Sequence, residues 1–98
     1  MWFGWIQFDI LLGDVQSLKE KRTVVRPIIS ELKRKFEVSV AETGELDVHR
    51  RVEISAGLVS ADGAHVIEVL DGIERLVAER PEIQLLSAGR RIHSSDDE

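Results

Sequence analysis

Few residues in this chain have the type and spacing that catalysis requires. Asp47, His49 and Arg51 cluster where a predicted turn leads into a strand, and such a group could transfer a proton. The other histidines, His65 and His93, pair with no further ligand at a spacing typical of a metal site. Cysteine is absent, and no glycine-rich phosphate loop or nucleophile motif occurs. We therefore expect no catalytic residue, no metal and no cofactor, and we predict a non-enzymatic protein.

The segment from residue 17 to residue 36 has the other chemically distinctive composition. It holds seven of the thirteen basic residues but only two of the eighteen acidic ones, in a chain whose net charge is −5. A protein with this overall charge does not condense on nucleic acid through its net field, whereas a local basic stripe still can. The segment is therefore the candidate for contact with phosphate groups.

On a helical wheel the charges of this segment separate from its apolar residues. Lys19, Arg22, Arg26 and Lys33 fall on one flank of the apolar stripe, and both glutamates fall away from them. Several cations on one flank can contact one phosphate backbone together, so we predict that these four bind RNA, with Lys21 and Arg34 at the margins. The alternative is a solvated helix face whose long side chains cover the edge of the core.

A helix from residue 18 to residue 36 must position these cations. Ser17 and Glu20 have the spacing of a capping box, in which the serine accepts from a free backbone N–H and the glutamate reaches back to the cap. Pro27 lies in the middle of this helix, where it removes the backbone bond to the Thr23 carbonyl. We expect a bend at Pro27; the alternative is that the helix starts later.

The remaining elements follow from hydrophobic periodicity. Alternation predicts strands, and a second apolar stripe behind a possible Asp62 cap predicts a second helix that ends at Pro81. The expected strands are residues 2–12, 37–42, 51–60 and 83–92, and the second helix is residues 64–80. The order βαββαβ is that of the α+β ferredoxin-like fold, a four-stranded antiparallel sheet with two helices packed on one face.

The uncovered face of such a sheet would carry Phe3 and Trp5. Exposed aromatic residues usually mark contacts, so we predict an interface there, either in a homodimer or under the C-terminal tail. The edge strand at residues 37–42 is a second possible dimer contact. The third strand offers no aromatic residue on this face, so we do not expect bases to stack on the sheet.

Length and composition fit one domain, residues 1–93, followed by a flexible acidic tail at 94–98. The apolar start of the chain lacks a basic region before it and is interrupted by Asp9, so it does not read as an export signal. No stretch approaches the length of a membrane span. We expect a cytoplasmic protein with no membrane partner.

Several motifs together resemble the YlxP-like family of small bacterial domains of unknown function. They are, in order, SLKEKR at 17–22, FEVSVAE at 36–42, Asp47 with Arg51, and Ser60 followed by Asp62, His65 and Val66. The resemblance covers nearly the whole chain and implies the ferredoxin-like fold. It also implies a gene often found near those of transcription and translation factors, including a ribosome-binding factor. His49 stands where family members often carry tryptophan.

Three functional hypotheses follow. The first is an accessory protein that contacts ribosomal or other structured RNA through the basic first helix. The second is a homodimeric protein-interaction module. The third is a small-molecule sensor or an enzyme on the same fold, for which the turn from Asp47 to Arg51 would be the site.

Overall fold

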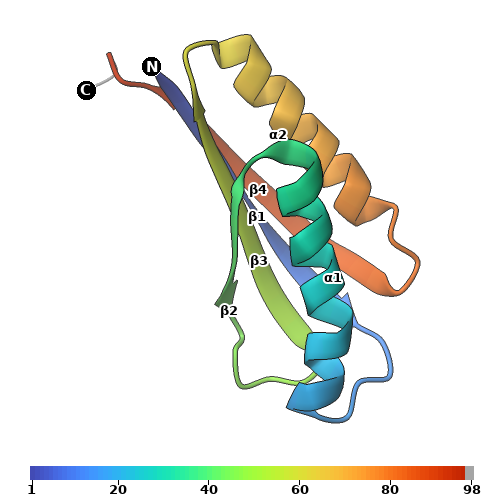
Figure 1. The fold of residues 1–98 in the computed structure, drawn as a ribbon. Coiled ribbons are helices and arrows are strands. Elements are labelled where there is room, and N and C mark those ends of the chain that lie inside the picture. Colours follow the sequence, from blue (N-terminus) through green and yellow to red (C-terminus); the bar gives the residue numbers. More distant parts are fainter. Residues whose placement is uncertain (97–98) are drawn as a thin grey trace.

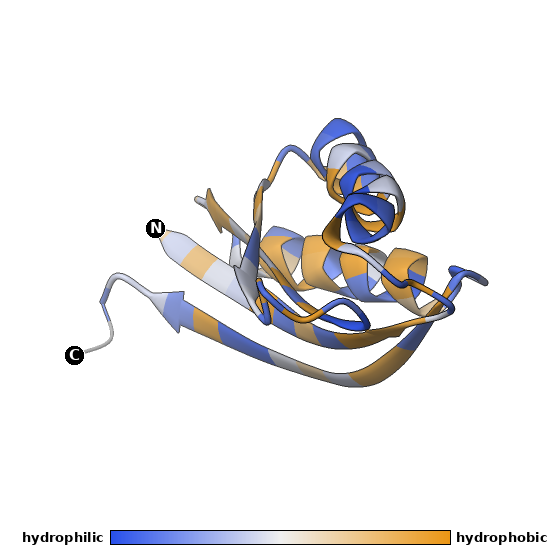
Figure 2. Cartoon of the chain, turned by 90° about the horizontal axis from the view of Figure 1, so that it is seen from below, coloured by the Kyte–Doolittle hydropathy of each residue, from blue (hydrophilic) through white to orange (hydrophobic). Residues whose placement is uncertain are grey.

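The computed structural model describes residues 1–96 and contains the predicted elements in the predicted order (Figure 1). The elements are β1 (Trp2–Leu12), α1 (Leu18–Phe36), β2 (Ser39–Gly44), β3 (Arg51–Ser60), α2 (Gly63–Ala78) and β4 (Ile83–Ser94). The strands form one sheet in the order β2-β3-β1-β4, with every neighbouring pair antiparallel. Both helices lie on the same face of this sheet, and the other face is uncovered (Figures 1 and 2). The ferredoxin-like prediction is confirmed.

The core lies between the sheet and the helices. On β1 the alternate residues Ile6, Phe8, Ile10 and Leu12 are fully buried. They meet the apolar stripes of α1 and α2 and the inner residues of β3, which are also buried: Val25, Ile28, Leu32, Val66, Leu70, Ile73, Val77, Val52 and Ile54. Burial of this continuous apolar surface fixes which flank of α1 faces outward.

The second strand starts later than predicted. The sequence pattern assigned residues 37–42 to it, whereas β2 spans Ser39–Gly44. Glu37 instead caps the end of α1 with the left-handed backbone angle φ 48°. Glycine or asparagine usually occupies that position, so a glutamate there gives no sequence signal for the end of the helix.

A β-bulge determines which side chains of β4 face the core. Asp9 of β1 pairs with Ser87, and the next residue, Ile10, pairs with Leu85. The residue between them, Leu86, is therefore extra on β4 and is exposed, while Leu85 packs against the core. Periodicity alone could not choose between the two leucines.

The strand also extends further than the predicted end at residue 92. It includes Ser94, which was expected to begin the flexible tail. Beyond it, the backbone N–H of Ser95 donates to the Met1 carbonyl at 2.8 Å. Residues 97 and 98 of the predicted tail lie outside the described residues.

Pro27 lies inside α1 without ending it. The helix starts at Leu18 and continues to Phe36, which excludes the late start. Pro27 and Thr23 are both exposed, and the Thr23 hydroxyl donates to the Lys19 carbonyl at 3.2 Å. Because proline has no N–H, the Thr23 carbonyl lacks its regular helical donor on a side open to water. The bend expected at Pro27 stays a prediction.

Candidate nucleic-acid interface

The start of α1 is held by side chains of its own first turn. The Ser17 hydroxyl accepts from the Glu20 backbone N–H at 3.1 Å, as a cap should. The Glu20 carboxylate accepts from the Gln16 backbone N–H at 2.8 Å, one residue before the expected partner. The cap thus fixes the end of the helix from which Lys19 and Arg22 project.

The four predicted RNA-binding residues all lie on the exposed surface of α1. Lys19, Arg22, Arg26 and Lys33 are exposed, and none forms an ion pair with a residue between 1 and 96. Lys19, Arg22 and Arg26 share one side of the helix and line a surface hollow of about 400 Å³ together with Thr23 and Pro27. We call the four cations the basic flank. Its charges are not neutralised by the described part of the chain.

Lys21 does not belong to the margin of this flank. Its side chain is only 3% exposed, and its ammonium group pairs with the Glu42 carboxylate at 3.0 Å. It also donates to the backbone carbonyls of Glu45 at 2.6 Å and Val48 at 2.8 Å. The prediction is wrong because Lys21 comes three residues after Leu18 and therefore lies on the apolar side of the helix. Its role is to hold the loop between β2 and β3.

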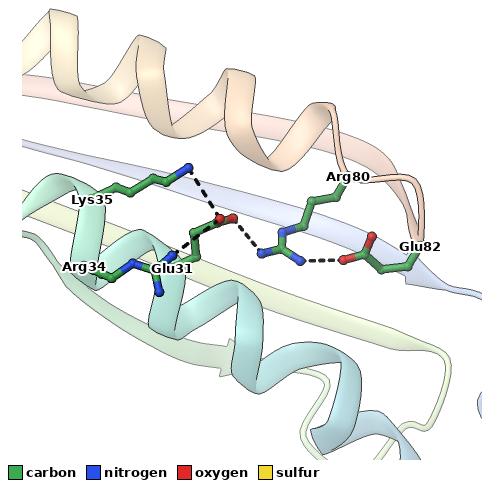
Figure 3. A network of polar contacts seen from close by, with 5 residues as sticks. All are labelled: Glu31, Arg34, Lys35, Arg80 and Glu82. Atoms are coloured by element: carbon green, nitrogen blue, oxygen red, sulfur yellow. Dashed lines mark hydrogen bonds and ion pairs between the residues drawn. The ribbon is translucent and has the colours of Figure 1, made fainter.

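Arg34, the other marginal residue, is partly neutralised. Its guanidinium lies 3.8 Å from the Glu31 carboxylate, which also pairs with Lys35 at 3.5 Å (Figure 3). Glu31 in turn pairs with Arg80 beyond α2, and Arg80 pairs with Glu82. The hydrogen bond from Arg80 lowers the pKa of Glu31, and Lys35 contributes further. We call these five residues the Glu31 network; it limits free positive charge on the side of α1 that faces α2.

The predicted interface residues lie on the uncovered face of the sheet. Trp5 is 37% exposed and Phe3 is 36% exposed. The Phe3 ring stacks on His93 of β4, with 5.2 Å between ring centroids and 24° between planes. Their use in a homodimer stays a prediction.

The group from Asp47 to Arg51 is divided in the structure. Arg51 binds Asp9 of β1 through two of its nitrogens, with the shorter contact at 2.6 Å. Asp47 and His49 lie exposed in the preceding loop.

Between residues 1 and 96 no group of three or more histidine, aspartate or glutamate side chains is placed to hold a metal ion. In the same part of the chain, no helix has the length and apolar character needed to cross a membrane.

The comparison with known sequences confirms the family resemblance. Residues 3–90 match the model of a family described as protein of unknown function (DUF503). The chain is also 30% identical over 81 residues to the uncharacterized protein YlxP of Bacillus subtilis (strain 168), covering 83% of this chain and 88% of that protein.

Solved structures support the fold. A de novo designed protein with a ferredoxin fold aligns with a TM-score of 0.56 at 14% identity, covering 99% of this chain and 89% of the other. SnoaB, a cofactor-independent oxygenase from Streptomyces nogalater, aligns with a TM-score of 0.51 at 11% identity, covering 99% and 95%. At such low identity both likenesses concern the fold alone.

Proposed function

Because the chain belongs to the DUF503 family of proteins of unknown function, its role must be argued from its own surface, and we propose that it is an accessory protein that binds structured RNA. The observation that carries the proposal is the basic flank: four exposed cations on one helix, without acidic partners in the described residues, in a chain of net charge −5. Ribosomal RNA is the proposed target.

The distribution of ion pairs supports this reading over a merely solvated helix face. Arg51, Arg80 and Arg90 each pair with a carboxylate from another part of the chain. Six of the thirteen lysine and arginine side chains pair with carboxylates within residues 1–96. Arg75 and Arg91 also lack such partners there, but the basic flank gathers four unpaired cations on one helix. An unneutralised row of cations is the surface that a phosphate backbone complements.

Binding should weaken strongly with salt. If all four cations contact phosphates, the logarithm of the association constant should fall with the logarithm of salt concentration with a slope of about −3.6 on duplex RNA, and less steeply on single strands. Replacing Arg22 and Arg26 by glutamine should reduce that slope by about two units. Titration of labelled ribosomal RNA fragments at several salt concentrations measures both values.

Ribosome co-sedimentation tests the target. The double variant Arg22→Glu/Arg26→Glu should no longer sediment with ribosomes at low salt. Arg26→Glu and Arg75→Glu form a matched pair of single variants, because both arginines are exposed on helices and make no ion pair with residues 1–96. Only Arg26→Glu should weaken binding. Unchanged sedimentation of the double variant, or equal losses in the matched pair, would exclude the basic flank as the RNA surface.

A further inference from the structure

The uncovered face of the sheet carries a hollow of about 490 Å³, which falls in the range of roughly 300–1,000 Å³ typical of small-molecule sites. We call it the sheet hollow. Its lining includes Trp5, Gln7, Asp9, Glu53, Gly89 and Arg91. The helices cover the opposite face of the sheet (Figure 2), so the hollow is separate from the basic flank.

Gly89 in the lining is not explained by the fold itself. It pairs with Gln7 inside β4, yet a Cβ atom built on it would meet nothing within 4 Å, and no glycine among residues 1–96 has a positive φ. At Gly4, by contrast, packing requires glycine, because a Cβ there would lie 2.6 Å from the Val66 side chain. Gly13 has surroundings as open as those of Gly89, but it lies in the bend after β1 and not inside a strand. A glycine inside a strand weakens it and often marks a bulge, a tight bend, or the close approach of a ligand or another backbone. The bulge of β4 lies at Leu86 and not at Gly89, which leaves close approach as the explanation for Gly89.

The hollow has a free cation at one end. Arg91 lies beside Trp5 on the neighbouring strand, and it makes no ion pair with a residue in the described range 1–96. A guanidinium in this setting suits an anionic group, above all a phosphate, which it can contact through two donors. The adjacent indole offers a flat apolar surface.

The other end is rich in carboxylates. Asp9 and Glu53 face each other on β1 and β3, and Asp9 is paired with Arg51 at 2.6 Å. Glu53 accepts from the side chains of Gln7 and Thr43, which leaves part of its acceptor capacity unused. Because an ionised carboxylate only accepts, this end suits a ligand edge that carries N–H donors. This end of the hollow, at Asp9, lies four residues along β1 from Trp5, which corresponds to about 13 Å.

We propose that the sheet hollow binds a purine mononucleotide with a guanine base. Its phosphate contacts Arg91, its planar base lies over Gly89 and beside Trp5, and the ring N–H and amino group of the base donate to Glu53. A nucleotide carries an anion, a flat ring and a donor edge in the order in which the hollow presents their partners. This site is independent of RNA binding by the basic flank.

Calorimetric titration of the intact chain with guanosine monophosphate tests the proposal. Inosine monophosphate, which lacks the amino group, and guanosine, which lacks the phosphate, should each bind at least about tenfold more weakly. Arg91→Gln should weaken the binding of guanosine monophosphate by a similar factor and leave the binding of guanosine unchanged. The variant Arg22→Glu/Arg26→Glu should bind the nucleotide like the wild type, which separates this test from that of RNA binding.

Gly89→Ala gives the sharpest readout. The methyl group meets no protein atom and alanine is the stiffer residue, so the midpoint of urea unfolding should rise while nucleotide affinity falls at least about tenfold. Gly13→Ala is the matched control, because a Cβ there also meets nothing within 4 Å but lies outside the hollow. It should leave nucleotide affinity unchanged.

Three results would overturn the proposal. One is the absence of binding by any of these nucleotides at millimolar concentration. Another is full affinity in Gly89→Ala. The third is a wild-type dimer in light scattering that Gly89→Ala dissociates, since a second copy of the chain would then occupy the hollow.

Discussion

At the scale of single residues, Lys21 shows how one position of a charged motif can serve the fold while its neighbours face solvent. Lys19 and Arg22 are exposed, whereas the Lys21 ammonium group is enclosed by two backbone carbonyls and the Glu42 carboxylate. Composition cannot make this distinction, but the helical period can, because it assigns Lys21 to the apolar side. The loop carbonyls that Lys21 binds lie more than twenty residues away, and no local pattern indicates them.

Replacement of Lys21 by methionine should therefore destabilise the protein. The change keeps most of the side-chain volume but leaves the Glu45 and Val48 carbonyls without their donor and Glu42 without its partner. We expect a loss of about 2 kcal/mol or more in the free energy of unfolding. Urea unfolding measures this loss. The control is Lys19→Met at an exposed position, whose free energy of unfolding should stay within about 0.5 kcal/mol of the wild-type value. Equal effects of the two changes would contradict the role assigned to Lys21.

At the scale of elements, capping residues predicted where the two helices start. Boundaries that depend on an unusual backbone conformation were not predicted. Ser17 and Asp62 accept backbone N–H groups at the starts of α1 and α2, close to where the sequence placed them. The start of β2 was missed because Glu37 adopts a left-handed conformation that its residue type does not indicate. The sheet hollow could not be predicted, since its lining depends on the register of strands far apart in sequence and on the bulge at Leu86.

Pro27 provides a test at this scale. Alanine at this position would supply an N–H for the Thr23 carbonyl within an uninterrupted helix, and Pro27 is exposed, so little packing is lost. We expect Pro27→Ala to raise the free energy of unfolding by about 1–3 kcal/mol in chemical denaturation. The control is Ser30→Ala, because Ser30 is exposed in the same helix and its replacement involves no proline. It should change the free energy of unfolding much less. A loss of stability in Pro27→Ala would mean that the core is adapted to a bend at this residue.

At the scale of the whole molecule, ion pairs join elements that the chain order separates. Arg90 of the edge strand β4 pairs with Asp71 and Glu74 of α2, at 2.8 and 2.9 Å. Arg80 joins α1 to the segment after α2 by pairing with Glu31 and Glu82, as Figure 3 shows. The Arg90 pairs join α2 to the sheet, and the Arg80 pairs join α1 to the segment after α2. Ion pairs of carboxylates should make the stability of the protein depend on pH.

The sign of that dependence follows from the Glu31 network. Hydrogen bonds from Arg80 lower the pKa of both Glu31 and Glu82 below the ordinary value of 4.5. A carboxyl whose pKa is lower in the folded state binds its proton more readily when unfolded, so its contribution to stability is present above 4.5 and is lost as the pH falls through the folded pKa. The wild type should therefore lose part of its stability on acidification.

Arg80→Gln isolates this contribution. The variant should unfold at lower urea concentration than the wild type at neutral pH. The difference between their urea midpoints should narrow as the pH falls below 4.5 and the Glu31 and Glu82 carboxyls take up protons. Arg75→Gln is the matched control, because Arg75 is exposed and pairs with no carboxylate within residues 1–96; its small effect should not change with pH. A difference in urea midpoint between wild type and Arg80→Gln that stays constant as the pH falls from neutral to well below 4.5 would show that Arg80 acts through packing rather than through its charge.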